Sequence, residues 1–323
     1  MLLFCACLPA TTQGVAPASQ ASGGSTIKVF LLAGQSNMEG YGVVDLDDEN
    51  DFNGGRGTFE FLLEDPVHQK SFGHWQAGED GWSTRDDVFI SYQPEHGPMK
   101  VGPLSVGFSG QTGRHHFGPE LEIGRILGDA FEEPVLLIKT CWGGKSLMTD
   151  FRPPSSKGAV GRYYTQMIDE YRAAIDSIAT TFPKLAGATP ELTGFFWFQG
   201  WNDQYEEGAL DAYAQNLVHL VTDLRIACAE PTLPVVVGQT GNADSEALWS
   251  AQEEATQRPE LADSSHYVPT RSFLRASEDS PNPTHQHHWF GNAESYLLVG
   301  QAMGEAMVKL IAKQAALVPR PGS

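Results

Sequence analysis

The chain contains few cysteines, few cationic residues and no long apolar run beyond its first residues. Four of the 323 residues are cysteine, and removal of the first segment would leave only Cys141 and Cys228, which excludes a disulfide framework. No stretch approaches the roughly 18 continuous apolar residues of a membrane span. Lys and Arg number 21 against 40 Asp and Glu, giving a net charge of −19. This charge argues against nucleic acids and strongly anionic polymers as partners, and favours neutral or weakly charged ligands.

The first residues, MLLFCACLPATTQGVAPASQASGGS, are apolar and then small and polar. They are typical of a secretory signal that lacks its basic start, with Ala16–Ala18 and Ser19–Ala21 as candidate cleavage motifs. We therefore predict a signal and linker over residues 1–24, and a secreted or periplasmic protein. A hydrophobic content of 41% fits a soluble globular domain, predicted as one unit over residues 25–316 with a tail at 317–323.

Short apolar runs alternate with amphipathic segments along most of the chain. The runs predicted as buried strands are Ile27–Ala33, Pro134–Thr140, Leu192–Gln199, Leu233–Gly238 and His266–Val268. The predicted helices are Gly118–Ala130, Tyr163–Phe182, Asp211–Cys228, Glu246–Arg258 and Asn292–Ala316. This alternation predicts an α/β fold with a central, mainly parallel five-stranded sheet between helical layers. Residues 41–117 show no clear period of apolar residues. We predict that they form an irregular insertion, which either is an addition to the surface of the domain or forms a wall of its site.

Polar, glycine-containing turns follow three of the predicted strands. They are Gly34-Gln-Ser-Asn37, Trp142-Gly-Gly-Lys-Ser146 and Gln199-Gly-Trp-Asn-Asp203, and a histidine-rich turn, Thr284–His288, precedes the last helix. Open parallel sheets concentrate binding sites at the carboxyl ends of their strands, so these turns are expected to converge.

The converging side chains suit acyl transfer, which needs a nucleophile, a base, a group to orient the base, and donors for the oxyanion. Ser36 is the predicted nucleophile, and the base is one of His285, His287 and His288. The oxyanion donors are predicted to be the N–H groups of Ser36 and of the glycine turn, with an amide side chain. That amide belongs to Gln199 or Asn202.

These turns also resemble the sequence blocks of the SGNH hydrolases. Gly34-Gln-Ser-Asn-Met-Glu-Gly40 resembles the first block of the sialate O-acetylesterase-like and carbohydrate esterase family 6 branch, which has GQSNM where other members have GDS. Gly200–Asp203 resembles the GxND block, within a Trp197–Gly200 segment similar to the WxQGE/D pattern. The Gly143–Gly144 turn matches the glycine block, and His288–Glu294 resembles the histidine block.

The resemblance runs in order from Ile27 to about Ala316, apart from the insertion. It implies a flavodoxin-like three-layer αβα sandwich and removal of acetyl groups from sugars such as acetylated xylan or sialate. It implies no metal and no other cofactor. His288 becomes the predicted base and Gly144 the predicted glycine donor. The substrate contacts are predicted at Gln35, Asn37, Trp201 and Arg152.

The acid that orients the histidine departs from the family pattern. The superfamily's acid stands three residues before the histidine, where this chain has His285, and the glutamate of the QGE pattern is replaced by Trp201. We predict Asp203 as the acid. The alternatives are Glu206, Glu278, Asp279 or a dyad without an acid.

Three other sites fit the same residues less well. Gly143–Ser146 lacks the first glycine of a P-loop because position 139 is Lys, and Met38 replaces the last glycine of the GxSxG elbow. The loop histidines are adjacent in sequence without carboxylate or thiolate ligands at metal spacing, which disfavours zinc. The alternative function is a carbohydrate-binding protein that keeps the fold without catalysis.

Overall fold

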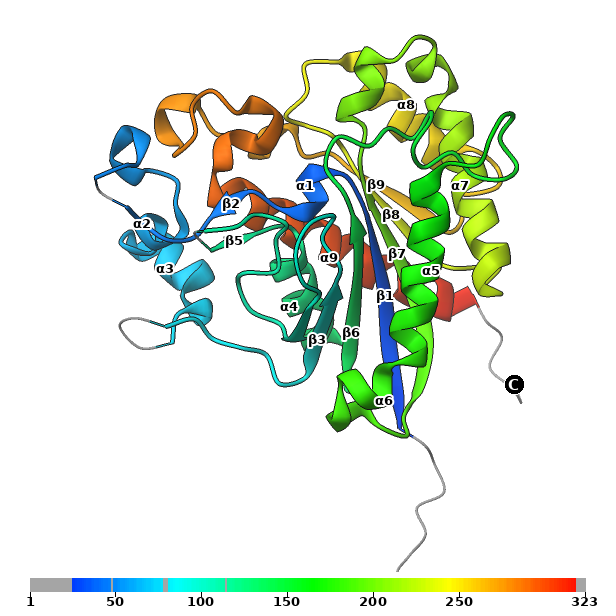
Figure 1. Ribbon diagram of the computed structural model, residues 1–323, viewed down its shortest axis with the longest axis horizontal. Coiled ribbons are helices and arrows are strands. Elements are labelled where there is room, and N and C mark those ends of the chain that lie inside the picture. Colours follow the sequence, from blue (N-terminus) through cyan, green and yellow to red (C-terminus); the bar gives the residue numbers. More distant parts are fainter. Residues whose placement is uncertain (1–24, 48, 78–80, 114, 318–323) are drawn as a thin grey trace, which may run out of the picture.

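The computed structural model describes residues 25–47, 49–77, 81–113 and 115–317, and the predicted signal lies outside them. Within this part of the chain a seven-stranded sheet has the order β4-β3-β6-β1-β7-β8-β9. Its parallel strands are β1 (Thr26–Gly34), β3 (Val88–Tyr92), β6 (Val135–Cys141), β7 (Thr189–Phe198), β8 (Val235–Gly238) and β9 (Ser265–Val268). Strand β4 (Lys100–Pro103) pairs antiparallel with β3 at one edge (Figure 1). The predicted α/β class with a mainly parallel sheet is confirmed.

Strand β1 is central because both of its faces are covered. Ile27, Val29 and Leu31 pack into one core, and Phe30 and Leu32 pack into the other. Successive side chains of a strand point to opposite faces, so an uninterrupted apolar run is what two covered faces require. This explains why the sequence of β1 shows no polar alternation.

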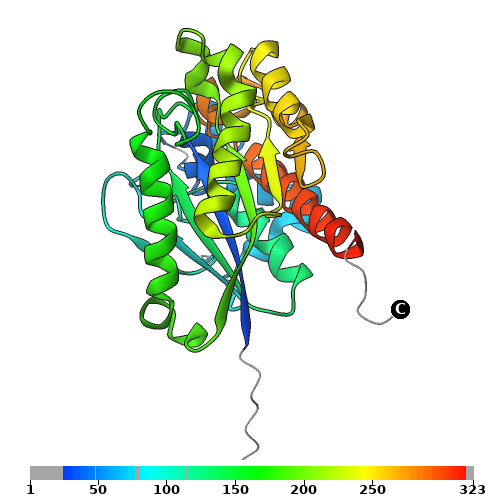
Figure 2. The same ribbon diagram turned by 90° about the vertical axis from the view of Figure 1, so that its right-hand side faces the viewer.

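Helices cover the two faces of the sheet. The first core packs against α5 (Arg162–Asp176), α7 (Ala209–Cys228) and α8 (Glu246–Gln257). The second core packs against α4 (Glu120–Ala130) and α9 (Ala293–Leu317). Figure 2 shows α5 and α9 on opposite sides of the sheet. These helices lie close to their predicted positions, because each presents an apolar stripe at helical spacing, but the helix predicted over Tyr163–Phe182 is divided at Ser177 into α5 and the short α6 (Ile178–Thr181).

The segment predicted to be irregular, residues 41–117, contributes two strands to the central sheet. It supplies β3 and β4, the short helices α2 (Phe59–Leu63) and α3 (Pro66–Phe72), and a small antiparallel pair of β2 (Gly42–Val43) with β5 (His116–Phe117). The prediction of five strands is therefore wrong in number. Helices of five and seven residues are too short to show a 3.6-residue period, and β3 is buried throughout, so it shows no alternation.

Single turns complete the described chain. They are α1 (Ser36–Glu39), α6 (Ile178–Thr181), η1 (Phe52–Gly55), η2 (Gly73–Trp75), η3 (Pro183–Leu185), η4 (Trp201–Tyr205), η5 (Arg271–Phe273), η6 (Ser277–Asp279) and η7 (Gln286–Gly291). Cys141 is buried and Cys228 half-buried, and both are free thiols. Among the described helices, none combines the length and the apolar character that a membrane crossing needs.

Candidate active site

Ser36 begins a single helical turn at the carboxyl end of β1. The chain turns sharply at Gly34, where a β-carbon would stand 2.2 Å from the Phe198 carbonyl oxygen of the neighbouring strand, so only glycine fits. The N–H groups of Met38 and Glu39 then bond to the Gln35 carbonyl and close the turn. Ser36 is only 6% exposed, yet its hydroxyl has no hydrogen-bond partner within the described chain. A hydroxyl at a strand end that bonds to no other described residue is free to act as a nucleophile.

Gln35 and Asn37, predicted as substrate contacts, instead bond to the protein. Both are almost fully buried. Gln35 Oε1 accepts from the N–H of Gly200 at 3.1 Å, and Gln35 Nε2 donates to Asn202 Oδ1 at 2.8 Å. Asn37 Oδ1 accepts from the Tyr296 hydroxyl at 3.2 Å, and its amide reaches Asn242 Oδ1 at 3.5 Å. The two side chains therefore brace Ser36 against the turns after β7 and β8 and against α9.

The glycine turn after β6 lies beside Ser36. A β-carbon built on Gly143 would stand 3.8 Å from Ser36 Cβ, and one on Gly144 would stand 4.0 Å from Asn202 Nδ2. Gly144 has a φ of +72°, which favours glycine. The N–H groups of Ser36 and Gly144 form no hydrogen bond to any other described residue. Both donors are therefore free for an oxyanion.

The two predicted amide donors differ in their availability. Gln199 is fully engaged, because its Nε2 donates to the Lys145 carbonyl at 3.0 Å and to Asp203 at 2.6 Å, while its Oε1 accepts from Tyr213. Asn202 is half-buried, and its Nδ2 donates to no group of the described residues. Asn202 is therefore the amide that fits the predicted role.

Asp203, the predicted acid, holds the glycine turn rather than a histidine. Its carboxylate accepts from the N–H groups of Leu147 and Met148 at 3.0–3.1 Å and from Gln199. Complete burial raises the pKa of Asp203 to about 6, although these donors favour its charged form. The prediction that Asp203 orients His288 finds no support in this geometry.

The carboxyl groups predicted as alternative acids also bond to other residues. Glu206 accepts from the Thr149 hydroxyl, and Glu278 accepts from the Ser277 hydroxyl at 3.1 Å. Asp279 pairs with Arg56 at 3.3 Å on the surface. Of these residues, none bonds to a loop histidine within the described chain.

The backbone of the histidine loop is tied to the serine turn. Asn242 Nδ2 donates to the carbonyl groups of Gln286 and His287, and the Tyr296 hydroxyl, which also bonds to Asn37, lies 3.4 Å from the His288 carbonyl. Helix α1 packs directly against η7. The structure therefore brings Ser36 and the histidine turn together, as the sequence predicts.

His288 is held by stacking and has no acid partner. Its ring lies on that of Tyr41 with a centroid distance of 3.5 Å and an angle of 19° between planes. Nδ1 is buried without a hydrogen-bond partner among the described residues. Burial, together with His287 and His285 nearby, lowers the pKa of His288 to about 3. The imidazole is therefore neutral over almost the whole pH range.

The neighbouring histidines lie close without forming a ligand cage. The ring of His287 is 4.0 Å from that of His288, and the ring of the exposed His285 is 5.4 Å from that of His287. No group of three or more His, Cys, Asp or Glu side chains suited to a metal ion occurs in the described residues. Trp201, predicted to contact substrate, is half-buried with its ring 5.9 Å from His287, so it flanks this loop.

Arg152, another predicted substrate contact, stabilises the loop that follows the glycine turn. Its Nε donates to the Met148 carbonyl at 2.7 Å. Its guanidinium lies against Gly158, where a β-carbon would stand 2.5 Å from Nη1. These contacts give Arg152 a structural role.

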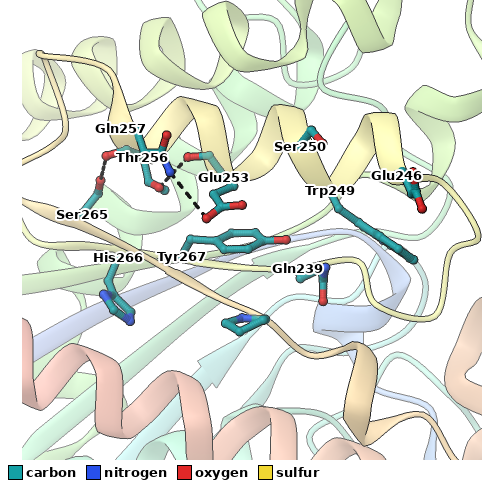
Figure 3. Close-up of a pocket in the computed structure, with 11 residues that line it drawn as sticks. Gln239, Glu246, Trp249, Ser250, Glu253, Thr256, Gln257, Ser265, His266 and Tyr267 are labelled. Carbon is teal, nitrogen blue, oxygen red and sulfur yellow. Dashed lines mark hydrogen bonds between the residues drawn. The ribbon is translucent and has the colours of Figure 1, made fainter.

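A separate cavity of about 850 Å³ lies between α8 and β9. Trp249 and Tyr267 line it with polar side chains that include Gln239 and Glu253 (Figure 3). None of the predicted site residues lines this cavity. Trp249 connects it to the segment that contains Asn242, because its indole donates to the Thr240 carbonyl.

The sequence analysis missed Glu39, Tyr92 and Lys139. The buried Glu39 carboxyl accepts a 2.9 Å hydrogen bond from the Tyr92 hydroxyl, and beneath it Lys139 forms a fully buried ion pair with Glu120 at 2.9 Å. The three-residue spacing from Ser36 to Glu39 was a usable signal. Tyr92 was hidden because its strand lies within the segment predicted to be irregular.

Solved structures share this fold. A protein from Arabidopsis thaliana is 14% identical, with a TM-score of 0.55 over 88% of this chain and 98% of that one. The protein NanS is 17% identical, with a TM-score of 0.53 over 91% of this chain and 98% of that one. At this identity the likeness supports the three-layer fold alone. A search of the curated proteins finds no match.

Family membership follows from the sequence. Residues 26–309 match the model of the family described as "Carbohydrate esterase, sialic acid-specific acetylesterase". Because the match spans most of the chain, the protein belongs to this family of carbohydrate acetylesterases, which are carboxylic ester hydrolases. The predicted resemblance and enzyme class are confirmed.

Proposed function

We propose that this carbohydrate esterase is a serine enzyme that removes O-acetyl groups through an acetyl-enzyme intermediate. The observation that carries the proposal is the Ser36 hydroxyl beside three donors, the N–H groups of Ser36 and Gly144 and the Asn202 Nδ2 amide, none of which bonds to another of the described residues. Donors aimed at the developing negative charge are the largest single source of catalysis in acyl transfer.

The proposed base is His288, acting in a dyad with Ser36. His288 takes the Ser36 proton as Oγ attacks the acetyl carbonyl, then returns it to the leaving sugar hydroxyl. It next deprotonates the water that hydrolyses the acetyl-enzyme. Stacking on Tyr41 orients the His288 ring. In a catalytic triad a carboxylate has that role. No metal or cofactor takes part in this scheme.

The proposed substrate is an acetylated saccharide of low charge. The net charge of −19 disfavours an anionic sugar, so acetylated xylan fits better than O-acetylated sialate. Trp201, half-buried beside the histidine loop, offers an indole face for a sugar ring. The predicted signal sequence supports secretion, where such polymers occur.

The test is hydrolysis of 4-nitrophenyl acetate by the native chain and by Ser36→Ala. Native turnover that falls at least about 10³-fold in Ser36→Ala, with an unchanged circular dichroism spectrum, supports the serine mechanism. Undiminished turnover by a folded Ser36→Ala variant would refute it. Rates on acetylated xylan and on O-acetylated sialate, compared at low ionic strength, then test the substrate class.

A carbohydrate-binding protein without catalysis is the alternative. His288 favours it, because its Nδ1 bonds to no acid among the described residues and an imidazole whose pKa is lowered to about 3 is a weak base. Binding of acetylated saccharide by a native chain that hydrolyses neither ester would establish this alternative.

A further inference from the structure

Glu39 is a buried carboxyl group beside the predicted nucleophile that the scheme above does not use. It ends α1, three residues after Ser36, so both side chains project from the same face of the helical turn. The residue is 6% exposed, and the Tyr92 hydroxyl donates to its Oε1 at 2.9 Å. A buried carboxylate normally requires an ion pair or several donors. Within the described chain, Glu39 has only this one donor.

The second carboxyl oxygen of Glu39 lies beside the glycine turn. A β-carbon built on Gly143 would stand 3.1 Å from Glu39 Oε2 and 3.8 Å from Ser36 Cβ. Glu39 Oε2 and the Ser36 side chain therefore both lie next to Gly143. Within the described residues, no group donates to Oε2.

The cations near Glu39 are committed to other partners. Lys139, on β6, donates to the Glu39 carbonyl and pairs with Glu120 rather than with the Glu39 carboxyl. Lys145, after the glycine turn, pairs with Glu95 at 3.1 Å. The neighbouring Glu95 charge opposes ionisation of Glu39.

The other titratable groups around Glu39 are neutral. They are the Cys141 thiol on β6, the Tyr92 phenol on β3 and the Tyr41 phenol, which follows α1. Burial raises the pKa of all three. Burial also raises the pKa of Glu39 above its usual value, and Glu95 adds to the shift. The Tyr92 hydrogen bond and the two lysines oppose it.

We propose that Glu39 acts as a neutral carboxylic acid whose Oε2–H donates a hydrogen bond to the acetyl oxygen as it becomes an oxyanion. Tyr92 fixes the acid through Oε1, which leaves the Oε2 hydroxyl to point toward the substrate. No proton is transferred, and the bond strengthens as charge develops on the oxygen. The inference rests on the proposed esterase function. Loss of one oxyanion donor lowers kcat by about 10²–10³-fold.

The test compares two variants on 4-nitrophenyl acetate across pH. Glu39→Gln keeps a neutral donor, and we expect kcat within about tenfold of the native value at low pH. Glu39→Leu removes the donor and is expected to lose about 10²–10³-fold. Native kcat is expected to fall as rising pH ionises Glu39, and Glu39→Gln is expected to lack that fall. Glu170→Gln is the matched control, because burial raises the pKa of Glu170 to about 7 and this carboxyl bonds to Gln166 on its own helix α5 rather than to the serine turn. It should keep the native pH profile.

A second measurement reads the protonation state without activity. In ¹³C-carboxyl NMR of Glu-labelled protein, the resonance that is missing from the Glu39→Gln spectrum belongs to Glu39. We expect the midpoint of its pH titration to lie above 4.5, the usual pKa of a glutamate. An inactive native chain would refute the proposed function and this inference together. An active native chain refutes the inference alone in either of two cases: Glu39 titrates at or below 4.5, or folded Glu39→Gln is as inactive as Ser36→Ala.

Discussion

The serine turn and the histidine loop are built in different ways. In the serine turn, both side chains flanking Ser36 are buried and bonded, Gln35 to the turn after β7 and Asn37 to Tyr296. In the histidine loop, hydrogen bonds reach the backbone of residues 286–288, while the Nδ1 atom of His288 has no partner among the described residues. The fold therefore positions the predicted nucleophile through bonds of its neighbouring side chains, and the predicted base through backbone hydrogen bonds of its loop and stacking of its ring.

The backbone of the histidine loop also holds an unusual conformation. Trp289 and Phe290, directly after His288, have φ values of 54° and 55°, in the left-handed region that bulky residues rarely adopt. The loop keeps this shape because the N–H of Asn282 bonds to the Phe290 carbonyl at 2.9 Å and Trp289 is fully buried. Strain of this kind persists where surrounding contacts determine the backbone, and it often accompanies function.

The largest expected effect separates two of the loop histidines, His288 and His285. His288→Ala should lower kcat on 4-nitrophenyl acetate by about 10²–10⁴-fold, because it removes the proposed base for the Ser36 proton. His285→Ala, at an exposed position of the same loop, should lower kcat less than tenfold. Steady-state kinetics with near-ultraviolet circular dichroism as the fold control checks both. The opposite ranking would move the base from His288 to His285.

A smaller effect is expected at Asp203. Asp203→Asn replaces one acceptor by a donor facing the N–H groups of Leu147 and Met148, which should cost about 1–3 kcal/mol of unfolding free energy and a moderate loss of kcat. A triad acid would behave differently, because replacing that acid by Asn lowers kcat about 10⁴-fold with the geometry intact. Urea unfolding measured together with kcat distinguishes the two. A loss near 10⁴ with unchanged stability would restore Asp203 as the acid.

Sequence patterns predicted the fold and the convergence of the strand-end turns. They worked where local chemistry dictates structure: apolar runs made β1 and β6, and glycine at position 34 made the turn before Ser36. They failed where tertiary contacts decide. No pattern shows that Asp203 faces Leu147 and Met148, or that Tyr41 covers His288, because these pairs are distant in sequence.

The pH dependence of stability should differ in sign between the predicted base and Asp203. His288 has a folded pKa of about 3 against an ordinary 6.5, so between these values the unfolded chain binds the extra proton and stability falls as pH falls. Asp203 has a folded pKa of about 6 against 3.8, so in that window the folded chain binds the extra proton and stability falls as pH rises. The two regions therefore oppose each other between about pH 4 and 6.

The last expected effect is on stability alone, a change in melting temperature when only the proposed base is removed. His288→Phe keeps an aromatic ring on Tyr41 and deletes the titrating group, so its melting temperature should rise relative to the native value as pH falls from 6.5 toward 3. Calorimetry at several pH values, with His285→Phe as the control for loss of a loop histidine, measures that difference. A constant difference would mean that burial does not shift the pKa of His288. A difference of opposite sign would mean that a carboxylate pairs with His288 in solution, and the histidine loop would then be built like the serine turn.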